Sequence, residues 1–113
     1  MRRGDAYWVR FDPTEGSEQA GTRPAVIVSR DAINRHSPVV VVCPMTTGAA
    51  RASRLYPSDV LVRAPERGLS VDSVVLTLHV PAVATVRLGN RLGTLKPATL
   101  QRIGEALKIT LDL

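Results

Sequence analysis

The chain is poor in several features that define large classes of proteins. It has one cysteine, Cys43, which excludes an internal disulfide and is too few for a cysteine metal cage. Its longest apolar run covers residues 39–43, far below the roughly 18 residues of a membrane-spanning helix. Residues 1–5 carry charge and glycine where a signal peptide has an apolar stretch. We therefore expect a cytoplasmic protein with no metal, no other cofactor and no membrane contact.

Aromatic and lysine side chains are also scarce. Only four residues are Trp, Tyr or Phe, so a surface that recognises RNA mainly by stacking is disfavoured. Thirteen of the 15 basic residues are arginine, and the formal net charge is +5. Because a guanidinium makes bidentate contacts with phosphate and carboxylate, this excess favours a polyanionic partner, although genome composition can also produce it.

The apolar pattern predicts short strands at close intervals. Residues 4–13 alternate apolar and polar side chains, which is typical of a strand with one buried face. Two nearly continuous β-branched runs, 24–29 and 39–44, indicate strands that are buried on both faces. The other expected elements are a polar loop at 14–22, one or two helical turns within 30–37 capped by Ser29, a basic loop at 48–54, a strand at 59–63, a turn at 64–68, a long strand at 71–80, and a segment at 85–88 that pairs with its end.

A helix is expected at the C-terminus, entered at Pro97. Four apolar side chains recur there at helical spacing: Leu100, Ile103, Leu107 and Leu111. Strands followed by a single terminal helix predict a mainly β fold, built as a small bent sheet or barrel. With no repeat or linker in the sequence, we expect one domain over residues 1–113.

A polar loop bracketed by glycines carries Glu18 and runs into the first β-branched strand. Pro24 disfavours a helical conformation at Arg23, so Arg23 is expected in an extended strand. If the two β-branched strands are antiparallel neighbours, Arg23 lies beside Thr46 and Thr47. The loop is short enough to fold Glu18 back over the same edge. A carboxylate, a guanidinium and two hydroxyls would then share one patch.

These groups suit the cleavage of RNA without a metal. In that reaction the 2′-hydroxyl of the RNA attacks the adjacent phosphate. The attack needs a base, a proton for the leaving 5′-oxygen, and stabilisation of the phosphoryl oxygens. Glu18 is the candidate base, Arg23 the candidate for charge stabilisation, and Thr46 the candidate donor to a phosphate oxygen. The alternative is a loop salt bridge between Glu18 and Arg23 beside threonines that end a strand.

Four strings follow one another along nearly the whole chain: Gly4-Asp5 with Trp8-Val9 and Phe11-Asp12-Pro13, GSEQAGTRPAVIVS at 16–29, Pro44-Met45-Thr46-Thr47, and Arg87-Leu88-Gly89 with Leu92-Gly93-Thr94-Leu95. They resemble the MazF/PemK family, the toxins of bacterial type II toxin–antitoxin systems. The resemblance implies an SH3-like β-barrel of the CcdB/MazF type, with a C-terminal helix and one or two short helices.

The same resemblance implies a homodimer that cleaves single-stranded RNA at short sequence motifs without a metal. The products would be a 2′,3′-cyclic phosphate and a 5′-hydroxyl, and an antitoxin would block the RNA groove with its C-terminal segment. In the family, the Glu and Arg of the E-Q-x-G-x-R-P string and the first Thr of P-x-T-T are tied to catalysis. They match Glu18, Arg23 and Thr46, called the catalytic trio below.

Further residues are expected to bind RNA: Ser17, Gln19, Thr47, Arg51, Arg54 and His79. The chain departs from the family at Leu78-His79, where many members carry Asp-Gln, and at the following Pro81, where a basic residue is frequent. That region helps to line the RNA groove in the family, so the sequence does not predict the cleavage motif.

Three alternatives stay open on the sequence alone. A gyrase inhibitor of the CcdB type would share the barrel but need no catalytic trio. A degenerate relative would bind RNA or an antitoxin without cutting. A two-histidine ribonuclease would use His36 and His79 as acid and base, but His36 is expected at the far end of the sheet.

Overall fold

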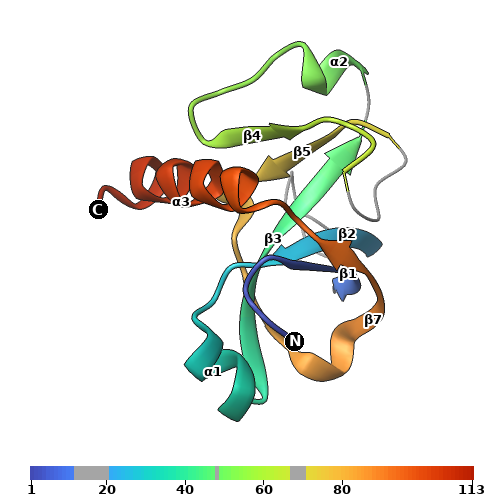
Figure 1. Ribbon diagram of the computed structural model, residues 1–113, viewed down its shortest axis with the longest axis vertical. Coiled ribbons are helices and arrows are strands. Elements are labelled where there is room, and N and C mark those ends of the chain that lie inside the picture. Colours follow the sequence, from blue (N-terminus) through green and yellow to red (C-terminus); the bar gives the residue numbers. More distant parts are fainter. Residues whose placement is uncertain (12–20, 48, 67–70) are drawn as a thin grey trace.

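The alternating and β-branched runs form strands that pair into one antiparallel sheet. The computed structural model describes residues 1–11, 21–47, 49–66 and 71–113 (Figure 1). The strands are β1 Asp5–Phe11, β2 Gly21–Ile27, β3 Val39–Thr47, β4 Asp59–Val62, β5 Ser73–Leu76, β6 Ala82–Ala84 and β7 Leu88–Thr94. Their order is β4-β5-β3-β2-β1-β7, and β6 pairs with β3 beside that path. The mainly β class is confirmed. Among the described residues β4 and β7 do not pair, so the expected barrel is a bent, open sheet.

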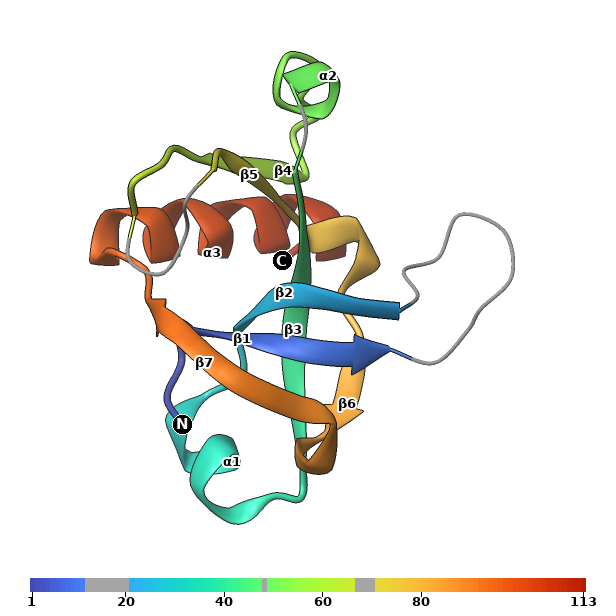
Figure 2. The same ribbon diagram turned by 90° about the vertical axis from the view of Figure 1, so that its right-hand side faces the viewer.

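The sheet is organised around β3, which runs the height of the molecule in Figure 2. Along one edge, residues 42–44 pair with β2. Along the other edge, residues 39–41 pair with β6 and residues 45–47 with β5. β3 therefore belongs to three ladders, and its register is fixed from both sides.

Pro44 lies in the gap between the β6 and β5 ladders. The backbone N–H of Val42 donates to the carbonyl oxygen of Pro81, 3.1 Å away, on that edge. Because alternate residues of a strand direct their nitrogens to the same edge, the nitrogen of Pro44 also faces it. A proline cannot donate there, and the change of partner strand makes that donor unnecessary.

Two hydrophobic clusters lie on opposite faces of the sheet, as the β-branched runs predict. Val40 and Val42 of β3 belong to one cluster, and Cys43 and Met45 belong to the other, because successive side chains of a strand alternate. The cluster around Met45 is covered by α3 (Pro97–Leu111), which packs against β4 in Figure 1. The other cluster also contains Val9, Phe11, Ala25, Ile27 and Val83.

α3 begins at Pro97, as predicted. Ile103 is fully buried, and Leu100 and Leu107 pack against the same cluster. Leu111 shares the helical spacing of these residues, but it is 52% exposed. In Figure 1 the C-terminal end of α3 extends past β4 and β5, so neither of these two strands covers its last turn.

The long strand expected at 71–80 is wrong in its length. Only β5 is a strand, and Thr77–His79 form a 3-10 turn, η1. The backbone N–H and the hydroxyl of Thr77 both donate to the carbonyl oxygen of Ser58, at 3.3 and 2.6 Å. The same hydroxyl lies 2.7 Å from Oγ1 of Thr110 on α3. These hydrogen bonds end β5 at Leu76 and hold the following turn against α3.

The pairing expected for 85–88 is also wrong. Thr85–Arg87 form a second 3-10 turn, η2, and β7 follows it and pairs with β1. The sequence of β7, LGNRLGT, has two glycines and no regular apolar alternation, so it gives no strand signal. Its pairing is supported by Asp5 of β1, whose Oδ1 accepts hydrogen bonds from the Thr94 hydroxyl at 2.7 Å and from Arg91 Nη2 at 3.4 Å.

Two short helices flank β3, as the resemblance implies. α1 (Asp31–His36) confirms the helical turns expected there, but its N-cap is Arg30 and not Ser29. The Ser29 hydroxyl bonds Oδ1 of Asn34 and accepts a hydrogen bond from a β3 backbone N–H, so it ties α1 to the sheet. α2 (Ala49–Ala52) occupies part of the expected basic loop.

Candidate active site

β2 and β3 are antiparallel neighbours, which is the relation on which the predicted site depends. Ala25 pairs with Pro44 at the last step of their ladder. Arg23 precedes Ala25 by two residues and Thr46 follows Pro44 by two, so the same register brings Arg23 to the level of Thr46. Beyond this step the strands separate, as β3 turns to β5 while β2 continues along β1 (Figure 2).

Arg23 and Thr46 belong to the same face of the sheet. Arg23 is two residues from Ala25 and Thr46 is four from Val42, and both reference residues belong to the cluster on the face away from α3. Arg23 and Thr46 are each half-buried. Arg23 also lies in the β1–β2 ladder and Thr46 in the β3–β5 ladder. Two paired strands thus hold a guanidinium and a hydroxyl toward one side of the sheet.

Pro24 acts as the sequence predicts. Arg23 is part of β2, so its conformation is extended. Pro24 pairs with Trp8 in β1, while the ladder with β3 begins at the next residue, Ala25. A proline in a strand needs a position where no donor is required, and the end of the β2–β3 ladder supplies one.

Ser17, Glu18 and Gln19 lie outside the residues that the structure describes. Of the catalytic trio, the structure therefore places Arg23 and Thr46 but not Glu18. The convergence of all three side chains stays a prediction. Thr47 is exposed at the end of β3 and by alternation belongs to the other face from Thr46.

Arg51, in the last turn of α2, is held by contacts with the connection to β4 and with β4 itself. Its Nη2 forms a 2.7 Å salt bridge with Oδ2 of Asp59, whose side chain is 2% exposed. Its Nη1 donates to the carbonyl oxygen of Arg54 at 2.6 Å. Its guanidinium carbon lies 5.3 Å from the centroid of the Tyr56 ring. The charge of Arg51 is thus compensated by a buried carboxylate, and its expected contact with RNA stays a prediction.

Sequence reasoning misses Tyr56, which is 58% exposed beside Arg51. The string R-A-S-R-L-Y-P, residues 51–57, does place an aromatic residue after two arginines and before a proline. That signal was available, but the buried partner that orients Arg51 becomes visible only in the fold. Arg54 is exposed, as expected for a residue that contacts a polyanion.

The two histidines lie at different levels of β3. His36 ends α1, just before β3 begins. His79 is half-buried in η1, close to the Pro81 carbonyl that bonds the middle of β3. This arrangement supports the expectation that they do not act as an acid–base pair. Leu78 beside His79 is 69% exposed, so this residue of the departure from the family lies on the surface.

Cys43 is a buried thiol, as expected for a lone cysteine in the core. Burial raises the pKa of Cys43 to about 12, so the thiol is neutral. Within the described ranges, no three His, Cys, Asp or Glu side chains gather as metal ligands would. None of the described helices has the length and apolarity needed to cross a bilayer.

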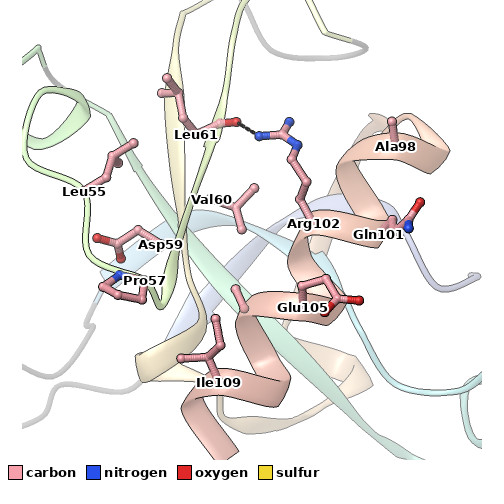
Figure 3. Close-up of a pocket in the computed structure, with 11 residues that line it drawn as sticks. Leu55, Pro57, Asp59, Val60, Leu61, Ala98, Gln101, Arg102, Glu105 and Ile109 are labelled. Carbon is pink, nitrogen blue, oxygen red and sulfur yellow. Dashed lines mark hydrogen bonds between the residues drawn. The ribbon is translucent and has the colours of Figure 1, made fainter.

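A groove of about 560 Å³ runs between α3 and β4 (Figure 3). Leu55 and Ile109 supply apolar surface, and Glu105 lies on its rim from α3. Arg102 crosses it and donates from Nη1 to the carbonyl oxygen of Leu61 at 2.9 Å. None of the described residues that line it belongs to the predicted site, so this groove and the candidate active site are separate features.

Comparison with known proteins adds the family. A family model described as "PemK-like, MazF-like toxin of type II toxin-antitoxin system" matches residues 2–111. The chain belongs to this PemK/MazF family. The motifs on which the resemblance rests all lie inside the matched range.

Individual PemK/MazF relatives match over their full length. Endoribonuclease MazF9 of Mycobacterium tuberculosis is 39% identical over 118 residues, which cover 100% of this chain and 98% of that protein. The crystal structure of MazF (Form-I) from Deinococcus radiodurans has a TM-score of 0.83 and 29% identity, covering 100% of this chain and 97% of that one. An endoribonuclease in complex with its cognate antitoxin, from Mycobacterial species, has a TM-score of 0.79 and 31% identity, with 100% and 96% covered.

Proposed function

We propose that this PemK/MazF-family chain is the toxin of a type II toxin–antitoxin pair and a metal-independent, sequence-specific endoribonuclease that cleaves single-stranded RNA. The enzyme class is supported by its relatives, since the mycobacterial protein carries the name endoribonuclease and so does the chain solved with an antitoxin. The observation that carries the proposal is the placement of Arg23 and Thr46 on one face of two paired strands.

In the proposed mechanism Glu18 removes the proton of the 2′-hydroxyl, whose oxygen then attacks the adjacent phosphorus. The bond to the 5′-oxygen breaks, which leaves a 2′,3′-cyclic phosphate and a 5′-hydroxyl once that oxygen takes a proton from Arg23 or water. The Arg23 guanidinium stabilises the negative charge that builds on the phosphoryl oxygens, and the Thr46 hydroxyl donates to one of them.

The decisive experiment incubates the purified full chain with a long single-stranded RNA in excess chelator and analyses the ends. We expect discrete cuts with cyclic phosphate and 5′-hydroxyl ends. No cutting, or cutting that needs an added metal, would contradict the proposal. If gyrase supercoiling is inhibited while the RNA stays whole, a CcdB-like inhibitor is the correct assignment instead. Binding of RNA without cutting would identify a degenerate relative.

Variants of the same protein test the mechanism. Arg23→Ala is expected to lower the cleavage rate about 10²- to 10³-fold, the loss typical of removing one group that stabilises transition-state charge. Arg35→Ala is the matched control, because Arg35 is an exposed arginine on α1 at the opposite end of the molecule from α2 (Figure 1). An Arg23→Ala protein that keeps full activity would remove Arg23 from the mechanism.

The proposed partners are RNA, a second copy of the chain, and an antitoxin whose extended C-terminal segment blocks the RNA groove. The antitoxin is supported by family membership and by the solved mycobacterial complex. The net charge of +5 suits both an RNA backbone and an acidic peptide segment.

A further inference from the structure

The connection between α2 and β4 holds an exposed aromatic ring in a fixed position. The backbone N–H of Tyr56 donates to Oδ2 of Asp59 at 2.8 Å, and the N–H of Asp59 donates to the carbonyl oxygen of Tyr56 at 2.9 Å. This second bond closes a turn of four residues that contains Pro57. Asp59 itself belongs to β4 and pairs with Leu76 of β5. The position of Tyr56 is therefore set by the sheet, although 58% of the residue is exposed.

Arg51 supports this ring from one side. Its guanidinium lies over the Tyr56 ring, and the salt bridge to Asp59 and the bond to the carbonyl of Arg54 hold it there. A ring kept in place by a guanidinium loses little entropy when a second planar group stacks on it. Arg51 thus has the contacts of a positioning residue.

The charges around the ring favour a planar ligand with a nearby phosphate. The Arg51 cation is compensated by Asp59 at 2.7 Å, so the ring and its support carry no net charge together. Arg54 is exposed three residues from Arg51. A cavity of about 480 Å³ is lined by Arg51, Ser53, Arg54 and Tyr56. An aromatic face beside one exposed guanidinium matches a nucleotide, whose base stacks while its phosphate meets the cation.

The helix that precedes this connection, α2, begins close to the end of the candidate active site. α2 begins at Ala49, two residues after Thr47, and packs against β3 and β5. The segment that carries Arg51, Arg54 and Tyr56 therefore leaves the sheet at the end of β3 that carries Thr46.

We propose that Tyr56 is a base-stacking residue for a nucleotide flanking the cleaved bond, that Arg51 positions its ring, and that Arg54 contacts the adjacent phosphate. This inference rests on the proposed function. An acidic peptide is the poorer fit, because it offers carboxylates and the carboxylate position beside Arg51 is already filled by Asp59. The chain has few aromatic residues, so this is one stacking subsite and not a stacking platform.

The test is a double-mutant cycle between Tyr56 and the individual bases of an RNA. Cut sites are first mapped on a long transcript. A short fluorescent oligonucleotide with the mapped motif is then made with a 2′-deoxy sugar at the attacking position, so that it binds without being cut. In a series of otherwise identical oligonucleotides, an abasic nucleotide replaces each other position in turn. Affinities of the wild type, Tyr56→Leu and Tyr56→Phe are measured by anisotropy, with thermal melting as the check on folding.

Tyr56→Leu is expected to weaken binding of the intact oligonucleotide about 5- to 150-fold, the value of one base–aromatic stack. At one flanking position the abasic oligonucleotide should remove this difference, because no base is left to stack. Tyr56→Phe keeps the ring and should keep the coupling. Arg54→Gln should reduce the dependence of log affinity on log salt by about one phosphate contact, whereas Arg35→Gln, with the same loss of charge, should leave it unchanged.

The outcomes separate this inference from the proposed function. A wild type that neither cuts nor binds RNA overturns both. A wild type that cuts, combined with a Tyr56→Leu variant that binds every oligonucleotide as tightly, overturns the inference alone. An equal loss with the intact and all abasic oligonucleotides shows a structural role and also overturns it. So does poly-glutamate binding that falls with Tyr56→Leu as RNA binding does, because that polymer has no bases.

Discussion

Arg51 of α2 and Arg54 of the connection that follows lie three residues apart, and their surroundings give them different chemistry. Arg51 faces a buried carboxylate and an aromatic ring, whereas Arg54 is exposed. The sequence alone does not distinguish the two arginines. Asp59 is eight residues from Arg51, and only the turn at Pro57 brings its carboxylate close to Arg51. The sequence predicts an RNA-binding arginine in this segment, but which of the two guanidinium groups is exposed depends on tertiary contacts.

Asp5 is a single residue whose environment predicts acid sensitivity. Burial raises the pKa of Asp5. Hydrogen bonds from Thr94, the Arg2 backbone and Arg91 together lower it by more than burial raises it, so the pKa lies below the usual 3.8. A carboxyl with a lowered folded-state pKa stabilises the fold above its unfolded pKa and loses this contribution as the pH falls through the folded value. We expect the free energy of unfolding to decline as the pH drops below about 4.

The measurement is urea unfolding between pH 7 and pH 2. Asp5→Asn should lower the free energy of unfolding at pH 7 by about 1–3 kcal/mol, because charged hydrogen bonds are lost from a buried group, and should flatten the acid decline. Asp112→Asn, at the exposed C-cap of α3, should change neither value. An unchanged acid decline in Asp5→Asn would assign the effect to other carboxyls, such as Asp31, where a hydrogen bond from the Arg3 backbone lowers the pKa.

At the scale of elements, the start of α3 is held by a residue from elsewhere in the chain. Its N-cap, Lys96, has no side-chain cap, and Glu66 takes that place. One Glu66 oxygen accepts from the Lys96 backbone N–H at 3.0 Å, and the other accepts from the Thr99 hydroxyl at 2.9 Å. A buried carboxylate at a helix N-terminus satisfies free donors and interacts favourably with the helix dipole.

Glu66→Ala is therefore expected to lower the free energy of unfolding by about 1–3 kcal/mol, because it leaves buried donors without an acceptor. Glu105→Ala, on the exposed side of the same helix with only a 3.8 Å pair to Lys108, should cost about 0.5 kcal/mol or less. Chemical denaturation of both variants measures the difference. Equal losses would mean that α3 does not depend on this cap.

The elements that the sequence predicts correctly are those whose signal is local. The alternation in β1, the β-branched runs of β2 and β3, and the proline at the start of α3 each reflect forces within one segment. β7 and the break after β5 depend on distant partners, Asp5 for one and the Ser58 carbonyl for the other. The pattern of apolar residues along the sequence cannot predict such long-range contacts.

The same distinction holds for the candidate site. The common register level of Arg23 and Thr46 was predictable because Pro24 fixes an extended strand and two apolar runs pair. Their common face also follows from the alternation of strands, once the core side of each strand is known. The orientation of Tyr56 was not predictable, because it needs the fold of the α2–β4 connection.

For the whole molecule, family membership predicts a homodimer. Sedimentation equilibrium of the full chain should give twice the 12.2 kDa of one protomer at micromolar concentration. The mass should be the same in low and high salt if apolar contacts hold the protomers together, since only ionic contacts are screened. A mass of a single chain over the same range would contradict the prediction.

The pairing of β1 with β7 joins residues near the two ends of the chain, with Asp5 opposite Thr94. Because its two strands are so distant in sequence, this pair cannot form on the ribosome until residue 94 has emerged. β1 therefore stays without its β7 partner while residues 12–94 are synthesised. Arg23 and Thr46 belong to β2 and β3, on the other side of β1 from β7, in a sheet that stays incomplete until then. The sheet that holds Arg23 and Thr46 is thus completed only after residues 88–94 have been synthesised, long after the two residues themselves.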